Sequence, residues 1–160
     1  MKRWQQILLG RPESVYQLVL NVLAPLLQLA VLLWLAFSYR SIPENVPTHY
    51  NFAGEIDGWG GKGALWLMPI IGIVTDLTLW AVEQFPQSWN LGPVPATPYV
   101  MHCARDLLAE TRLAISVLFA SISAVTILHP SHYPGWLLGA ATALCILPLI
   151  RFAVRAIRKR

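Results

Sequence analysis

The first long apolar stretch, LVLNVLAPLLQLAVLLWLAF at residues 18–37, decides the class of fold. It contains no charged side chain, and its length matches the roughly 20 residues that a helix needs to cross a bilayer. The whole chain has the same character, with 56% hydrophobic residues, 12% charged residues and a mean hydropathy of +0.52. A soluble domain carries about 25% charged residues. We therefore predict an integral membrane protein, not a soluble enzyme or a nucleic-acid-binding domain.

Three further apolar stretches complete a topology of four spans. Besides residues 18–37, we expect spans at about residues 64–82, 113–128 and 136–150. A polar segment at 38–63 joins the first two spans, and a proline-containing segment at 83–110 joins the next two. Short connections favour an antiparallel bundle, and the lipid requires every backbone polar group to be satisfied internally. The sequence thus predicts one all-α transmembrane domain over residues 1–160, with an ordered outward loop between helices one and two.

The positions of the basic residues predict the orientation. Of the twelve Lys and Arg residues, eight lie near the two ends of the chain: Lys2, Arg3, Arg11, Arg151, Arg155, Arg158, Lys159 and Arg160. Basic residues accumulate on the cytoplasmic side of a membrane, where they attract anionic lipid headgroups. We therefore expect both termini in the cytoplasm of a bacterium or archaeon, the protein in its cytoplasmic membrane, segment 38–63 outside and segment 83–110 inside. The net charge of +4 then indicates membrane lipid, not nucleic acid, as the partner.

Asp76 is the acidic side chain that lies well inside an apolar stretch. A charge at the centre of a bilayer costs about 3 kcal/mol, so we expect Asp76 to be paired, protonated or next to a cavity. Asn21 and Gln28 of the first span bracket the same depth on one helix face, and Arg112 lies within reach from the interface. These polar residues form either a hydrogen-bonded cluster that fixes helix packing or an ion-sensitive carboxyl group.

The segment at residues 42–62, IPENVPTHYNFAGEIDGWGGK, is the most informative connection. Its prolines restrict the backbone, its glycines permit turns, and Asp57-Gly58 is a strong turn dipeptide. Its apolar residues suggest that it packs onto the ends of the spans. We expect an ordered cap that presents a recognition surface.

The order of residues in this segment, Pro43-x-x-x-Pro47-x-His49-x-Asn51-x-x-Gly54-x-x-Asp57-Gly58-Trp59-Gly60-x-Lys62, resembles the domain-of-unknown-function family 1648. That family includes the N-terminal part of SdpI-like membrane proteins. The resemblance implies immunity against a secreted toxin and signalling by sequestration of a repressor at the membrane, and it implies no catalytic residues. The candidate residues for binding a partner are Pro47, His49, Asn51, Gly54, Asp57, Trp59 and Lys62.

Metal binding and catalysis are weaker interpretations. His49, His129 and His132 all fall on the predicted outer side and would suit zinc if two connections converged. Hydrogen bonding within the connections is the favoured role for these histidines. The sequence contains no hydrolase, zinc-protease or phosphate-binding motif, and Cys103 and Cys145 form no disulfide framework. We expect no cofactor and no enzymatic activity.

The leading functional hypothesis is a small non-catalytic membrane protein that binds a protein or peptide partner through residues 42–62. Two alternatives remain open. The chain could be an accessory subunit of a larger membrane complex, or a small carrier or channel that uses Asp76. The sequence leaves the oligomeric state undetermined.

Overall fold

Four long helices make up most of the computed structural model, which describes residues 13–51, 53–128 and 131–158. They are α2 (Val15–Ser38), α3 (Leu67–Gln84), α4 (Pro98–Leu128) and α5 (Gly135–Arg158). Each is long and apolar enough to cross a membrane, α3 together with the 3-10 turn that precedes it. The protein is therefore a multi-pass membrane protein surrounded by lipid.

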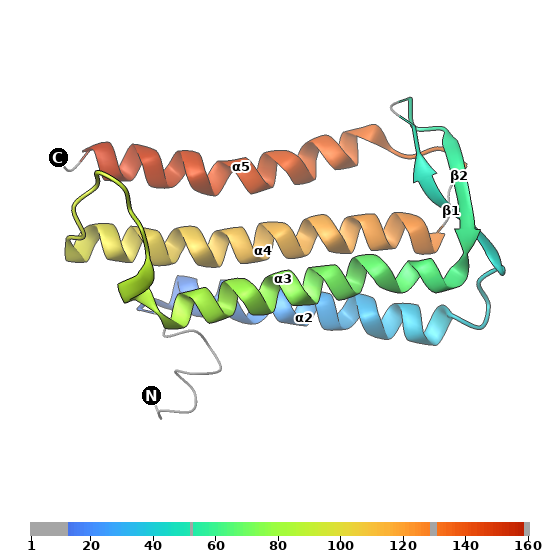
Figure 1. Cartoon of the computed structure of the whole chain (residues 1–160), viewed down its shortest axis with the longest axis horizontal. Helices are drawn as coiled ribbons and strands as arrows, with labels where there is room; N and C mark the ends of the chain where they lie inside the picture. The colour runs from blue at the N-terminus through green and yellow to red at the C-terminus, as the bar shows by residue number, and fades with distance from the viewer. Residues whose placement is uncertain (1–12, 52, 129–130, 159–160) are drawn as a thin grey trace.

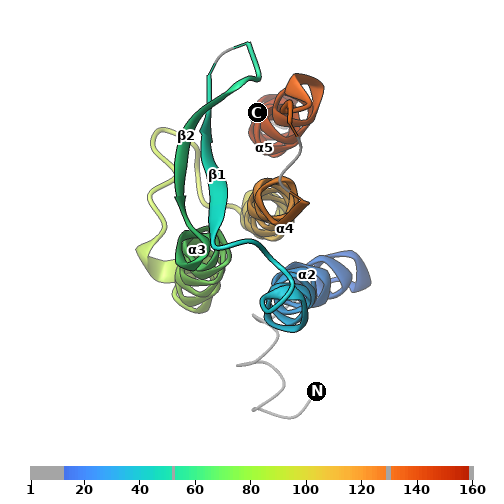
Figure 2. The same ribbon diagram turned by 90° about the vertical axis from the view of Figure 1, so that its right-hand side faces the viewer.

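The four helices lie side by side along one axis (Figure 1). Helix α4 packs against α2, α3 and α5, whereas α2 and α3 contact each other less extensively. Seen from the end, α4 stands between α5 and the pair formed by α2 and α3 (Figure 2). The central helix is thus the element that holds the other three together.

Polar and apolar residues are distributed as lipid requires. Large apolar side chains point outward along the helices, among them Leu26, Phe37, Val74, Leu147 and Ile157. The interfaces between helices instead contain buried polar side chains, namely Gln17, Asn21, Gln28, Asp76, Glu83, Arg105, Asp106, Arg112, Ser116 and Ser123. Lipid tails solvate Leu as well as a protein interior does, so polar contacts and close packing hold such helices together.

Two helices are longer than the predicted spans. Helix α4 begins at Pro98, so the predicted connection at 83–110 is helical over its last part, and α5 continues beyond residue 150 to Arg158. Most of the charged residues in these longer parts are paired within the protein. Asp106, for example, accepts hydrogen bonds from Gln17 and Arg155.

The connection between the first two spans forms a β-hairpin, so the all-helical prediction is wrong for this segment. Strand β1 (Asn45–Tyr50) pairs antiparallel with β2 (Ile56–Gly61), and the 3-10 turn η1 (Lys62–Trp66) leads into α3. Asp57 and Gly58 lie within β2, and hydrogen bonds between Asn51 and Glu55 close the reversal of the chain instead. A positive φ of 84° at Gly54 makes this reversal possible, because a residue with a side chain is strained there.

The hairpin lies across the ends of the helices, at the end of the molecule opposite the start of α2 and the finish of α5 (Figures 1 and 2). Ile42 and Val46 are buried there in an apolar cluster with Leu35, Leu65 and Ile127. Trp59, by contrast, is 59% exposed, so it does not pack onto the helices as Ile42 and Val46 do.

Candidate functional site

The middle of the hairpin brings two of the predicted residues together. His49 Nδ1 lies 2.5 Å from Asp57 Oδ1, and both side chains are exposed. His49 stands opposite Gly58 in the strand pairing, and a Cβ at Gly58 would lie only 2.8 Å from the Cβ of His49. Glycine is therefore needed at position 58 so that the histidine can fold across β2 to Asp57.

The tip of the hairpin is fixed to the segment that precedes α5. Asn51 and Glu55 close the reversal with backbone and side-chain hydrogen bonds of 2.8–3.1 Å. The amide of Tyr133 donates to the carbonyl of Gly54 at 2.7 Å, and a Cβ at Gly54 would lie 2.8 Å from the Tyr133 carbonyl oxygen. The small size of Gly54 thus allows the tip to join a segment almost eighty positions later in the chain.

The base of the hairpin is fixed to the first helix turn that follows it. Lys62 Nζ lies 2.7 Å from Glu44 Oε1 and 5.1 Å from the ring centre of Tyr39. Pro47 is buried opposite Trp59 in the strand pairing. Pro47 and Lys62 therefore support the hairpin, whereas most of the Trp59 side chain is exposed.

A pocket of about 240 Å³ lies beneath the hairpin. Its walls come from β1, from Met68 of α3, from the last turns of α4 and from Tyr133. His49 and Asn51 line it, and the rings of Tyr50 and Tyr133 meet with centres 5.5 Å apart. Burial raises the pKa of both tyrosines above the ordinary value, so each phenol remains a neutral hydrogen-bonding group at physiological pH.

The sequence indicated only part of this site. Tyr50, Met68 and Tyr133 were not among the predicted binding residues, and no motif marks them. The contact between Tyr50 and Tyr133 joins residues that are far apart in the sequence, so pattern alone could not find it.

His49 and His132 make different contacts. His132 pairs with Glu55 through a backbone bridge, and His129 lies outside the described residues. Within residues 13–51, 53–128 and 131–158, no three His, Cys, Asp or Glu side chains group so that they could hold a metal ion.

A second polar site lies inside the helices and contains Asp76. Arg112 Nε donates to Asp76 Oδ1 at 2.9 Å, and Nη2 donates to Asp76 Oδ2 at 3.2 Å. Arg112 Nη1 donates to Asn21 Oδ1 at 3.1 Å and to Glu83 Oε2 at 3.3 Å. Asn21 in turn donates to both oxygens of Glu83 at 3.0 and 3.3 Å. One guanidinium group therefore links side chains of α2 and α3 to α4.

Gln28 lies apart from this cluster, although its depth in the sequence had suggested a shared site. Its Nε2 donates to the carbonyl of Ser116 at 3.4 Å, and its amide lies against Gly72. A Cβ at Gly72 would be 2.7 Å from Gln28 Nε2, so glycine allows α2 and α3 to approach here.

Two ion pairs join α4 to α5 near the end of the molecule opposite the hairpin. Arg155 Nη1 donates to Asp106 Oδ2 at 2.7 Å, and Arg151 Nη1 contacts Glu110 Oε1. The sequence analysis missed both acidic residues. The spacing of the residues was a usable signal. Asp106 and Glu110 are four residues apart in α4, and their partners Arg155 and Arg151 are four residues apart in α5.

Comparison with known proteins agrees with the resemblance noted in the hairpin sequence. Residues 26–73, from α2 through the hairpin into α3, match the family model described as Domain of unknown function (DUF1648). The chain is also 37% identical over 70 residues to an uncharacterized protein of Archaeoglobus fulgidus. That similarity covers 38% of this chain and 38% of the relative. No solved structure matches the chain. The protein is therefore a multi-pass membrane protein in which residues 26–73, from within α2 through the hairpin into the first turns of α3, match the DUF1648 model.

Proposed function

We propose that this protein is a non-catalytic membrane protein that binds a protein or peptide partner through the hairpin, in an SdpI-like immunity or signalling role. The observation that carries the proposal is the pocket beneath the hairpin. Tyr50 and Tyr133 give it aromatic walls, and His49 and Asn51 add polar groups to its lining. A volume of about 240 Å³ suits one or two side chains of a partner rather than a whole small molecule, whose pockets start at about 300 Å³.

The neighbouring surface supports the same proposal. Trp59 is 59% exposed beside the His49–Asp57 pair, and exposed tryptophan is enriched among the residues that dominate binding energy. Strand β2 is also an edge of the two-stranded sheet, and an edge strand offers backbone groups with which another strand can pair. A partner could therefore insert a side chain into the pocket while its backbone lies against the hairpin.

In this proposal the four helices form an antiparallel bundle in the cytoplasmic membrane of a bacterium or archaeon, with both termini inside and the hairpin outside. The basic residues of α5 support that orientation, because they lie at the end opposite the hairpin. The hairpin would then meet secreted proteins or peptides at the outer surface.

The test is photocrosslinking in the cells that produce the protein. A photoreactive amino acid at exposed Thr48 should give a discrete adduct with one protein or peptide, identified by mass spectrometry. Tyr50→Ala should abolish the adduct, because it opens the aromatic wall of the pocket. The control Gln87→Ala, at an exposed position beyond the far end of α3, should leave the adduct unchanged. Adducts that survive Tyr50→Ala would contradict the proposal.

The two alternatives make different predictions in the same cells. An accessory subunit should co-purify with other subunits in a fixed ratio and be degraded without them. A carrier should lose transport on Asp76→Asn while remaining folded. The bidentate contact between Asp76 and Arg112 favours a structural role for this carboxyl group, since both of its oxygens are already bound.

A further inference from the structure

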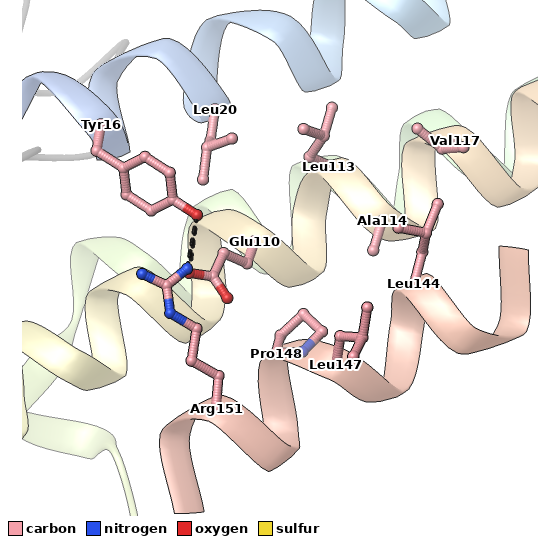
Figure 3. A pocket seen from close by; sticks show the side chains of 10 residues that line it. All are labelled: Tyr16, Leu20, Glu110, Leu113, Ala114, Val117, Leu144, Leu147, Pro148 and Arg151. Carbon is pink, nitrogen blue, oxygen red and sulfur yellow. Dashed lines mark hydrogen bonds and ion pairs between the residues drawn. The ribbon is translucent and has the colours of Figure 1, made fainter. Parts of the chain in front are cut away.

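A second hollow lies between α2, α4 and α5, at the end away from the hairpin. It is a groove of about 430 Å³. The groove exists because α5 packs on α4 but stands away from α2 (Figures 2 and 3). Leu113 and Val117 of α4 and Leu144 and Leu147 of α5 give it apolar walls. From Glu110 to Val117 it extends seven residues along α4, or about 10 Å at 1.5 Å per residue.

The groove ends at a polar group of three side chains. Arg151 Nη1 donates to the hydroxyl of Tyr16 at 2.9 Å and contacts Glu110, as Figure 3 shows. One turn further along α5, Arg155 binds Asp106. Among the described residues, the side-chain hydrogen bonds of both arginines use Nη1, and the side chains are 41% and 33% exposed. Each guanidinium group carries five N–H donors, so further donors remain for a ligand.

The position of these arginines along α5 corresponds to the edge of the hydrocarbon layer. Residues 135–150 of α5 are free of charge and span about 24 Å as a helix, while the hydrocarbon core of a bilayer is about 30 Å thick. Arg151 therefore lies close to the edge of the hydrocarbon layer, and its long side chain, with that of Arg155 one turn further along, can reach lipid phosphates. A guanidinium group binds phosphate with two parallel hydrogen bonds, which makes arginine well suited to this contact.

We propose that the groove binds a hydrocarbon chain of an anionic phospholipid, whose phosphate is held by Arg151 and Arg155. The volume favours a lipid chain over a second helix. A helix is about 10–12 Å in diameter and fills roughly 800–1,100 Å³ over a length of 10 Å, about twice the space available. The combination of apolar walls with cationic groups at one end matches a lipid with a charged headgroup.

Native mass spectrometry of the purified protein tests the headgroup contact. The protein is titrated with phosphatidylglycerol and, separately, with phosphatidylcholine. Arg151→Gln should weaken binding of phosphatidylglycerol roughly tenfold, because charge-assisted hydrogen bonds are lost. Arg158→Gln removes the same charge from an exposed position in the last turn of α5 and should change binding by less than about twofold. Equal weakening by both variants would mean general attraction to the basic end and would overturn the proposal.

A second pair of variants tests the hydrocarbon contact without changing any charge. Val117→Phe should fill the groove and weaken binding of phosphatidylglycerol, whereas Val154→Phe makes the same change at a lipid-facing position outside the groove and should have no effect. Thermal unfolding in detergent confirms that each variant is folded. If the Val117→Phe protein binds phosphatidylglycerol as tightly as the wild type, the proposal is overturned. It is also overturned if the wild type is a dimer and Val117→Phe converts it to a monomer, because the groove would then hold a second copy of the chain.

Discussion

At the scale of single residues, Arg112 connects the buried polar side chains around Asp76. It is buried in α4 and contacts Asp76, Glu83 and Asn21, so side chains of both α2 and α3 depend on it. A buried ion pair contributes little net stability compared with apolar packing, yet removal of one partner leaves an uncompensated charge. The same side chain is thus replaceable only together with its partners.

Replacement of Arg112 alone should therefore be far more damaging than replacement of the whole cluster. We expect Arg112→Met to lower the free energy of unfolding by about 3–5 kcal/mol, measured by thermal unfolding in detergent. The triple variant Arg112→Met, Asp76→Asn, Glu83→Gln should recover most of that loss, because no charge of this cluster remains buried. A triple variant no more stable than the single one would show that the charges are not the cause.

Gly54 is a second position at which the structure requires one particular residue, here glycine. We expect Gly54→Ala to destabilise the hairpin by more than the roughly 1 kcal/mol that a positive φ costs a residue with a side chain, because its Cβ would also collide with Tyr133. Gly92→Ala is the matched control, since Gly92 also has a positive φ, of 60°, but open space around it. Equal losses in unfolding temperature for the two variants would rule out the contact with Tyr133.

At the scale of elements, close approach of helices depends on small residues at their interfaces. Gly72 lies in α3 against Gln28 of α2, where a Cβ would come within 2.7–2.8 Å of the amide group of Gln28. The hairpin depends on the helices in a similar way, because its tip and base are fixed by Tyr133 and Lys62. The helices and the hairpin therefore depend on one another for their stability.

Gly72→Ala should reduce the free energy of unfolding by about 1–3 kcal/mol, since it forces the buried amide of Gln28 to move. Gly139→Ala makes the same change in α5 with nothing within 4 Å and should be neutral or slightly stabilising, because alanine favours helix. Unfolding of both variants in detergent is the measurement. A Gly72→Ala protein as stable as Gly139→Ala would contradict the packing argument.

At the scale of the whole molecule, four helices long enough to cross the membrane put the start of α2 and the finish of α5 at one end and the hairpin at the other (Figure 1). Lipid surrounds the long sides, and both ends meet water. Every partner from solution must therefore approach either the hairpin or the end rich in arginine.

Labelling of single cysteines in intact cells should reveal which end is outside. In a variant without Cys103 and Cys145, Thr48→Cys should react with a membrane-impermeant maleimide, and Arg158→Cys should react only after the cells are permeabilised. Both positions are exposed, so accessibility depends on the side of the membrane. The reverse pattern of labelling would place the hairpin inside and exclude a secreted partner for it.

The amino-acid sequence by itself determined the membrane class, because each apolar stretch is recognised from its own length and composition. It also identified the segment of the hairpin, through a pattern of prolines and glycines that lies within the stretch matched by the family model. For Asp76 it supplied a set of neighbours at the right depth, including Arg112 and Asn21, but not the bonds among them.

The tertiary structure decided everything that depends on which faces of the helices meet. The contacts of Arg112 with Asp76 and Asn21 join residues 36 and 91 positions apart, and the helix rotation that creates them has no local signal. The same packing separated Gln28 from that cluster, brought Tyr133 under the hairpin and left the groove beside α5. The strand register, with Asp57 and Gly58 in β2 instead of a turn, likewise follows from cross-strand packing of His49 and not from the dipeptide alone.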